Sequence, residues 1–340
     1  MSIGVAILGG GIFAREEHLP AVNKSKDLTL KAVYSRSLKS AKSLEADEGK
    51  VDLYSDDSGS GKSLDDLLSR SDIQAVIIAL PIKNQPEYIR KSLLAGKHVL
   101  SEKPVAENVQ EAVELIEWYE KEIQPKGVTW GVAENARFWA ATVHAGEQRQ
   151  KVGKALTFRA RMQALVEGGK YFETDWRKVP THQGGFLLDG GVHFTASLRV
   201  LLGKDEPITS ISAYTAQLQP HLPPVDTVEA TAKTKSGAVG SISISFGTTA
   251  IGSEYHVGSE KGFVSVSKGV VTVGDKEEKI EEEGSGVTPE VRAWGEGLAA
   301  KKPNPLQNAR EALADLEIIE ACLRSGEQGA VPIELKYQHV

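Results

Sequence analysis

Short apolar runs alternate with amphipathic stretches through the first 133 residues of the chain. The apolar runs cover residues 3–8, 28–34, 73–80, 97–100 and 128–133, and each predicts a buried strand. Between the last two runs, Val109, Val113 and Ile116 share one helical face, so residues 108–121 predict a helix. Strands that alternate with helices in this way predict an α/β domain whose parallel sheet is covered by helices on both faces.

The pattern changes after about residue 134. Runs at 241–246 and 264–266 alternate apolar and polar side chains with a period of two, which predicts half-buried antiparallel strands. Helical spacing returns at about 186–202 and 306–325, so this part predicts an α+β domain. We therefore expect domains at 1–133 and 134–340, with the helix at about 306–325 allowed to pack back on the first. Because no long linker separates the two, we expect the substrate pocket in the cleft between them.

The charge balance and the cysteine content narrow the functional classes. The 340 residues include 40 Lys and Arg against 46 Asp and Glu, a net charge of −6, so we expect no nucleic-acid partner. The single cysteine, Cys322, excludes an internal disulfide and a thiolate metal cage, which favours the cytoplasm. We find no apolar stretch long enough to span a membrane, no basic leader and no metal-binding spacing among the eight histidines. We therefore expect neither membrane association nor a metal.

A glycine-rich turn follows the first predicted strand. Gly9, Gly11 and Ala14 occupy the small positions of a G-x-G-x-x-A motif, which lies between a strand and a helix as dinucleotide binding requires. The glycines allow a tight turn and a close approach of pyrophosphate, and amides at the helix start face the anion. We expect a dinucleotide to contact Gly9, Gly11, Ile12 and Phe13; the alternative is a glycine-rich turn without a ligand.

The end of the second strand indicates which dinucleotide is bound. An acidic residue there would hold a ribose 2′-hydroxyl, but the chain has Ser35, Arg36 and Ser37 instead. One guanidinium and two hydroxyls suit a 2′-phosphate, so we predict a preference for NADP(H). The alternative is that Arg36 is a solvated surface residue. We also expect Leu80 and Pro81, at the end of the strand at 73–80, to contact the cofactor.

Two further segments carry candidate chemistry. Glu102, Lys103 and Pro104 follow the strand at 97–100, where a lysine at the carboxyl edge of the sheet can polarise a substrate oxygen. In the predicted helix at 186–202, Asp189 and His193 are four residues apart and share a face. His193 can pass a proton to or from a substrate oxygen, while Asp189 orients it or binds substrate. The alternative is an Asp–His pair with a purely structural use.

These motifs together resemble the glucose-fructose oxidoreductase, inositol dehydrogenase and rhizopine catabolism (Gfo/Idh/MocA) family over nearly the whole chain. The resemblance rests on Gly9-x-Gly11-x-x-Ala14, Glu102-Lys103-Pro104 and Asp189-x-Gly191-x-His193, in that order. It implies an N-terminal Rossmann domain with a doubly wound sheet, and a C-terminal α+β domain with a large, mostly antiparallel open sheet. It also implies NAD(P)-dependent oxidation or reduction of sugars, polyols or related carbonyl compounds.

The resemblance assigns roles to individual residues. Lys103 falls on the family's catalytic lysine, and Asp189 and His193 fall on its carboxylate and its proton-transferring histidine. The Trp176-Arg177 pair resembles the tryptophan-arginine found beside the nicotinamide, and we expect these two residues and Glu102 at the cofactor. Substrate contacts are expected from segments that border the cleft, at Asn135, Arg137, Tyr171 and Asp189.

Two positions depart from the family pattern. Ala196 stands where many relatives have an aspartate, which argues against polyol recognition of the inositol dehydrogenase type, and Gln85 stands where many have a histidine. The remaining set predicts hydride transfer between NADP(H) and a carbonyl or hydroxyl carbon, with Lys103 polarising the oxygen and His193 moving the proton. The alternatives are a non-catalytic NADP-binding sensor on the same scaffold, and a dihydrodiol or xylose dehydrogenase. The polar face marked by Ser241, Ser243 and Ser245 and the resemblance predict a homodimer or homotetramer through the C-terminal sheet.

Overall fold

The computed structural model describes residues 2–44 and 49–339 and divides the chain into two compact units. The first unit combines Met1–Glu134 with Val287–Ala309, and the second combines Asn135–Gly286 with Arg310–Val340. The segment that returns to the first unit is thus 287–309, whereas the C-terminal helix belongs to the second unit from Arg310 onward.

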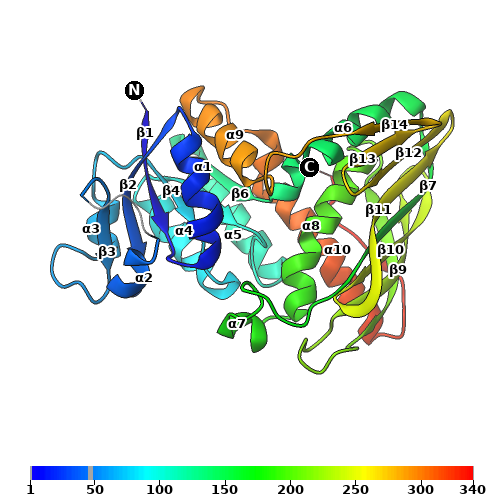
Figure 1. Cartoon of the computed structure of the whole chain (residues 1–340), viewed down its shortest axis with the longest axis horizontal. Coiled ribbons are helices and arrows are strands. Elements are labelled where there is room, and N and C mark those ends of the chain that lie inside the picture. Colours follow the sequence, from blue (N-terminus) through cyan, green and yellow to red (C-terminus); the bar gives the residue numbers. More distant parts are fainter. Residues whose placement is uncertain (1, 45–48, 340) are drawn as a thin grey trace. The chain divides into compact units, whose positions relative to one another are not determined.

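The first unit contains a six-stranded parallel sheet (Figure 1). Its strands are β1 Ile3–Leu8, β2 Leu28–Ser35, β3 Asp52–Ser55, β4 Ala75–Ile78, β5 His98–Glu102 and β6 Trp130–Ala133, in the spatial order β3-β2-β1-β4-β5-β6. This is the doubly wound Rossmann order, and it reverses between β1 and β4. Ligands of such sheets bind beyond the carboxyl ends of the strands at this reversal.

Most helices of the first unit connect these parallel strands, whereas the helix at Val287–Ala299 and the turn at Pro305–Gln307 belong to the segment that returns from the second unit. The helices are the π-helical turn η1 Ala14–His18, α1 Leu19–Lys24, α2 Leu38–Lys42, α3 Leu64–Leu68, α4 Gln85–Leu94, α5 Val109–Glu122 and α9 Val287–Ala299, with short 3₁₀ turns at Ile82–Asn84, Gln124–Lys126 and Pro305–Gln307. The helix predicted at 108–121 corresponds to α5, whose first turn is capped by Asn108 through a hydrogen bond from the Glu111 amide.

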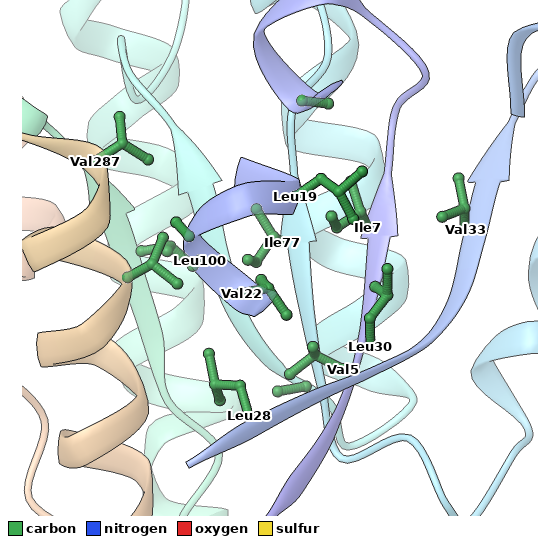
Figure 2. Packing of buried hydrophobic residues seen from close by; sticks show 14 of the residues in the cluster. Val5, Ile7, Leu19, Val22, Leu28, Leu30, Val33, Ile77, Leu100 and Val287 are labelled. Carbon is green, nitrogen blue, oxygen red and sulfur yellow. The ribbon is translucent and has the colours of Figure 1, made fainter. Parts of the chain in front are cut away.

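Apolar side chains from the strands, α1 and α9 form one buried cluster (Figure 2). Ile7 and Leu100 extend from the sheet, Val22 comes from α1, and Val287 comes from α9. Val287, Val291 and Trp294 recur at four and three residues and are all buried, which is the apolar stripe that a core-facing helix needs. Burial of this stripe explains why residues 287–309 return to the first unit.

The second unit contains a nine-stranded, mostly antiparallel sheet. Its strands are β7 Ala155–Leu165, β8 Ile208–Ala216, β9 Thr227–Thr234, β10 Val239–Ser245, β11 Gly247–Ser259, β12 Gly262–Ser267, β13 Val270–Val273, β14 Lys276–Lys279 and β15 Ile333–Glu334. Their spatial order is β14-β13-β12-β11-β7-β10-β9-β8-β15, and β10 pairs with β7 in parallel while the other pairs are antiparallel. The α/β plus α+β class expected from the sequence is therefore confirmed.

Helices α6 Ala140–Arg149, α8 Gly185–Leu202 and α10 Ala309–Glu327 lie along one face of this sheet (Figure 1). The unit also contains the single-turn helix α7 Asp175–Lys178 and the 3₁₀ turns η4 Asn135–Phe138 and η5 Gln150–Val152. On the opposite face, Gln163 donates to the hydroxyl of Ser243, and this hydroxyl donates to Glu229. Ser243 is therefore buried although it faces away from Ile242 and Ile244, because polar side chains of its own face cover it.

Candidate active site

The three small residues of the glycine-rich turn, Gly9, Gly11 and Ala14, lie in different environments. Gly9 has φ +125°, and a Cβ there would lie 2.2 Å from the carbonyl oxygen of Ala79. Among the residues that the structure describes, a Cβ at Gly11 would meet nothing within 4 Å, so none of their atoms explains the absence of a side chain there. Ala14 is fully buried where η1 begins. The open space at Gly11 fits a pyrophosphate that must approach the backbone closely.

Helix η1 continues directly into α1, so the turn opens a helical segment from Ala14 to Lys24. The Arg15 amide donates to the Gly11 carbonyl at 3.1 Å, which places the start of helical bonding at this glycine. Amides of a first helical turn attract anions. Ile12 and Phe13 are partly exposed at this point. The residues of the turn therefore fit the phosphates of a dinucleotide.

The three residues at the end of β2 lie in different environments. Ser35 is buried, Arg36 is exposed, and the hydroxyl of Ser37 caps α2 by accepting from the Ser40 amide at 3.2 Å. Asp57, beyond β3, accepts from the Leu38 amide and from Ser55 Oγ, both at 2.6 Å. The Ser55 hydroxyl and then the Leu38 amide lower the pKa of the Asp57 carboxyl. A carboxylate therefore lies beside the Arg36 turn, which the sequence analysis missed because β3 was not predicted.

Residues after β4 complete the edge of the sheet at its reversal point. Leu80 and Pro81 are partly exposed, and the Ala79 amide donates to the Leu8 carbonyl, which holds the end of β4 against β1. Gln85, at the start of α4, is only 1% exposed. Neither atom of its amide group has a hydrogen-bond partner among the residues that the structure describes.

Lys103 follows the last residue of β5. Its amide donates to the Ala133 carbonyl at 3.2 Å, so the lysine turn is tied to the end of β6, and its side chain is partly exposed. The preceding Glu102 extends inward, where it accepts a hydrogen bond from Nε2 of His18 at 2.7 Å. His18 was not predicted as a site residue, because 84 residues separate it from Glu102 and the π-helical turn that carries it has no sequence signature.

In the second unit, the structure brings Asp189 and Arg177 together. Nε of Arg177 donates to Asp189 Oδ2 at 2.7 Å, and Asp189 is 4% exposed. The guanidinium also donates to the Tyr171 carbonyl and stacks on the Trp176 ring, 4.0 Å from its centroid. The Asp189 carboxylate, the Trp176-Arg177 pair and the Tyr171 backbone therefore form one cluster, although only their separate motifs were visible in the sequence.

His193 lies one turn after Asp189 on α8 and is partly exposed. Its ring centroid is 6.3 Å from that of Trp139, at an interplanar angle of 37°. Indole Nε1 of Trp139 donates to the Ser285 carbonyl, and so does the Asn135 side-chain amide. These bonds fix the indole that faces the imidazole.

The two glycines between Asp189 and His193 on α8 have a packing explanation. A Cβ at Gly190 would lie 2.7 Å from the Phe246 ring, and one at Gly191 would lie 3.0 Å from Cδ1 of Ile319. Side chains of the turn between β10 and β11 and of α10 therefore approach the helix backbone closely at these glycines. Ala196 is fully buried on the same helix.

Arg137 lies in a buried ion-pair network. Its guanidinium lies 2.6 Å from Asp315 Oδ2 and 3.6 Å from Glu311 Oε2, and Arg199 pairs with the same two carboxylates. Arg137 is 3% exposed, so its charge is already compensated by α10. This contact accounts for Arg137 without a substrate, in contrast to the partly exposed Asn135 and Tyr171.

Comparison with known proteins agrees with this geometry. Residues 3–128 match the model of the Gfo/Idh/MocA oxidoreductase family with an NAD-binding Rossmann fold, and residues 149–335 match that family's C-terminal alpha/beta domain. The chain belongs to the Gfo/Idh/MocA family. The family's nicotinamide-binding fold fits the open glycine turn described above.

Relatives of this Gfo/Idh/MocA protein match over nearly its whole length. Dehydrogenase FPY6 of Fusarium mangiferae is 43% identical over 338 residues, covering 95% of this chain and 96% of the relative. The crystal structure of an oxidoreductase from Thermotoga maritima has a TM-score of 0.87 and 32% identity, covering 98% of each chain. An aldose-aldose oxidoreductase from Caulobacter crescentus, solved with glycerol, shares the fold with a TM-score of 0.81 and 20% identity, covering 98% of this chain and all of that one.

The described residues contain neither a metal-binding cluster nor a membrane-spanning helix. Across residues 2–44 and 49–339, no group of three or more His, Cys, Asp or Glu side chains is arranged to hold a metal ion. In the same described part of the chain, no helix is both long and apolar enough to cross a bilayer.

Proposed function

We propose that this oxidoreductase uses NADP(H) to interconvert a carbonyl and a hydroxyl group on a sugar, a polyol or a related small carbonyl compound. The observation that carries the proposal is the presence of Lys103, Asp189 and His193 in a chain that matches both domains of the family. A protein that only sensed its cofactor would have no need for all three residues. When bound, the dinucleotide supplies or accepts the hydride.

The residues of the chain divide the remaining work. Lys103 donates a hydrogen bond to the reacting oxygen and favours negative charge on it. His193 donates the proton in the reductive direction and accepts it in the oxidative one. Asp189 and Arg177 form an ion pair. This pair fixes the guanidinium that stacks on the Trp176 ring. The glycine turn, Leu80 and Pro81 receive the cofactor.

The choice of NADP(H) rests on Arg36. Its side chain is exposed at the end of β2 and can pair with a 2′-phosphate through two parallel hydrogen bonds. The Asp57 carboxylate near this turn accepts from the Leu38 amide and from Ser55, and these two donors orient it while it keeps its negative charge. The Ser35 hydroxyl at the same turn adds a second donor for the phosphate.

The substrate class follows from the polar and aromatic groups of the second unit. Trp139 and Trp176 offer flat apolar faces, and Asn135 and Tyr171 offer hydrogen bonds, a combination that suits polyhydroxy carbonyl compounds. The structural relative from Caulobacter crescentus is named as an aldose-aldose oxidoreductase, which supports the same class. Ala196 leaves an apolar position on α8 and disfavours inositol.

A substrate panel tests the proposed function. Aldoses, ketoses, polyols and dihydrodiols are assayed with NADP(H) and with NAD(H) in both directions, by absorbance of the reduced nicotinamide. We expect turnover of at least one sugar or polyol, and about a 10²–10⁴-fold lower kcat in His193→Ala with cofactor affinity nearly unchanged. Cofactor binding without turnover of any compound would favour the sensor instead.

We also propose that the protein is a cytoplasmic homodimer or homotetramer that assembles through the face of the second sheet opposite α8. This face carries a groove of about 510 Å³ lined by side chains that include Ser212, Thr231 and Ser241. Tyr214 and Val239 are strongly exposed on β8 and β10. Light scattering tests the proposal, and a monomeric mass would reject it.

A further inference from the structure

The hydrogen bond between His18 and Glu102 connects the helical turn that follows the glycines to the end of β5, directly before Lys103. His18 is the last residue of η1, the helical turn that follows the glycines, and Glu102 is the last residue of β5, directly before Lys103. The imidazole is fully buried, and the Glu102 side chain is 12% exposed. A hydrogen bond to a carboxylate is stronger when water is excluded in this way.

A second acid completes this cluster. Glu290 on α9 is fully buried, and neither of its carboxyl oxygens has a hydrogen-bond partner within residues 2–44 and 49–339. Burial, followed by the charges of Glu102 and Glu134, raises the pKa of Glu290 well above its ordinary value. Burial and the neighbouring carboxylates therefore favour the protonated form of Glu290, which reduces the negative charge that α9 places near Glu102.

We propose that His18 is a positioning residue for Lys103: by holding Glu102, it fixes the turn that presents the lysine ammonium to the substrate oxygen. This inference rests on the proposed role of Lys103. Consecutive Cα atoms lie 3.8 Å apart, so a movement of Glu102 reaches Lys103 directly. The Lys103 amide is bound to the Ala133 carbonyl, and the bond to His18 holds the side chain of the residue before it, so both contacts bear on the placement of the lysine turn.

The physical reason is the response of the Glu102 carboxylate to the loss of the hydrogen bond from His18. A nearly buried carboxylate that loses its hydrogen bond is left with an uncompensated desolvation cost, and rotation toward water relieves that cost. We expect such a rotation to shift the backbone of Lys103, which directly follows Glu102. A displacement of about 1 Å at a reacting group can lower the rate about 10²-fold.

Three variants separate positioning from a merely structural role. His18→Leu removes the donor, and His18→Gln returns a side-chain N–H at a similar distance. Leu19→Ala is the matched control. Leu19 follows His18 and belongs to the buried apolar cluster of the first unit, so this variant removes buried volume but leaves the imidazole intact. We expect His18→Leu to lower kcat about 10- to 100-fold with cofactor Kd changed less than about 3-fold. We expect His18→Gln to recover most of kcat and Leu19→Ala to retain it.

A double-mutant cycle with Lys103→Ala gives the decisive readout. A residue that acts through Lys103 has nothing left to position in that background, so adding His18→Leu should lower the residual turnover no further. Multiplicative losses would overturn the inference, as would equal losses in His18→Leu and Leu19→Ala. If His18→Leu does not fold, the same cycle is run with Glu102→Gln, where a multiplicative loss again rejects positioning.

A second readout needs no turnover. After reductive ¹³C-methylation, the Lys103 resonance is assigned by its absence in Lys103→Ala, and its chemical shift and pH titration are compared among the variants. We expect both to change in His18→Leu and to return in His18→Gln; an unchanged resonance rejects the inference. Failure of the proposed function and failure of the positioning role give different results. Full turnover in Lys103→Ala rejects the proposed function. Lost turnover in Lys103→Ala together with full turnover in His18→Leu rejects only the positioning role.

Discussion

Nε of Arg177 lies 2.7 Å from Oδ2 of Asp189, and this ion pair connects the short helix α7 to the first turns of α8. The carboxylate is therefore engaged by an arginine that itself stacks on Trp176 at 4.0 Å. Asp189 was expected to orient His193 or bind substrate; its contact with Arg177 gives it a third role, the attachment of the α7 segment to the helix that carries His193.

Replacing Asp189 by Asn should weaken both stability and activity. Asn keeps the shape but removes the charge, so Arg177 loses its ion partner in a mostly buried site. We expect a loss of about 1–3 kcal/mol in the free energy of unfolding, discounted for the partial exposure of Arg177, and at least a 10-fold lower kcat. Denaturant unfolding and steady-state kinetics measure the two effects.

Arg177→Lys is the matched variant for this pair. It keeps the positive charge but loses the planar stacking on Trp176 and the geometry of the Nε hydrogen bond. We expect a smaller stability loss than for Asp189→Asn, together with a raised substrate KM. Unchanged kinetics in both variants would mean that the pair has no part in the active site.

Substitutions at Gly9 and Gly11 of the turn should have different effects, one on the stability of the protein and the other on cofactor binding. In Gly9→Ala, the new Cβ would overlap the Ala79 carbonyl oxygen at a φ of +125°, so we expect a loss of stability of about 1–3 kcal/mol or more. In Gly11→Ala, the methyl group meets no protein atom within 4 Å. We therefore expect unchanged thermal unfolding but at least 10-fold weaker cofactor binding, measured by nicotinamide fluorescence. Wild-type affinity in Gly11→Ala would place the pyrophosphate elsewhere.

Arg36 determines the expected preference between the two cofactors. Arg36→Ala should weaken NADP(H) binding by at least 10-fold and change NAD(H) binding by less than about 2-fold, because only the former carries a 2′-phosphate. Arg36→Lys, which keeps the charge without the two-pronged geometry, should fall between the wild type and Arg36→Ala. The fluorescence titration gives both affinities, and equal NADP(H) affinity in the wild type and Arg36→Ala would leave this arginine as a surface residue.

The sequence predicted five of the six strands of the first sheet, whose apolar runs are plain, but in the second sheet it predicted only segments that match β10 and β12. It predicted α8 from the helical spacing of its apolar residues. It missed β3, a four-residue strand with an exposed Asp52 at its start, which has too few apolar positions to show a period. The return of residues 287–309 was missed because no helix was predicted at Val287–Ala299. Even an amphipathic stripe there would show only that a helix is buried, and not against which sheet.

The sequence predicted those parts of the candidate site that short motifs carry, namely the glycine turn, Lys103 and the Asp189-His193 spacing. It was incomplete where partners are distant in sequence. His18 finds Glu102 84 residues away, and Arg137 finds Asp315 178 residues away. In neither case does a local pattern indicate the partner, so His18 was overlooked and Arg137 was placed at the substrate rather than in a buried ion-pair network.

The raised pKa of Glu290 makes the stability of the protein depend on pH. Below its ordinary value of 4.5, this carboxyl is protonated in both the folded and the unfolded state. As the pH rises above 4.5, the unfolded chain releases the proton while the folded protein retains it, because burial and then the charges of Glu102 and Glu134 oppose ionisation. Glu290 therefore lowers stability progressively from about pH 4.5 until its own raised pKa is passed.

Glu290→Gln removes this titration while nearly keeping the shape of the side chain. We expect the difference in Tm between Glu290→Gln and the wild type to rise by at least about 2 °C from pH 5 to pH 8. Glu296→Gln is the control, since Glu296 is exposed on the same helix and its replacement should shift Tm equally at both pH values. Differential scanning fluorimetry at pH 5.0, 6.5 and 8.0 gives the comparison. A Tm difference that stays constant with pH would show that Glu290 ionises in the folded protein as readily as in the unfolded chain, and that the acids around Glu102 carry their charges together.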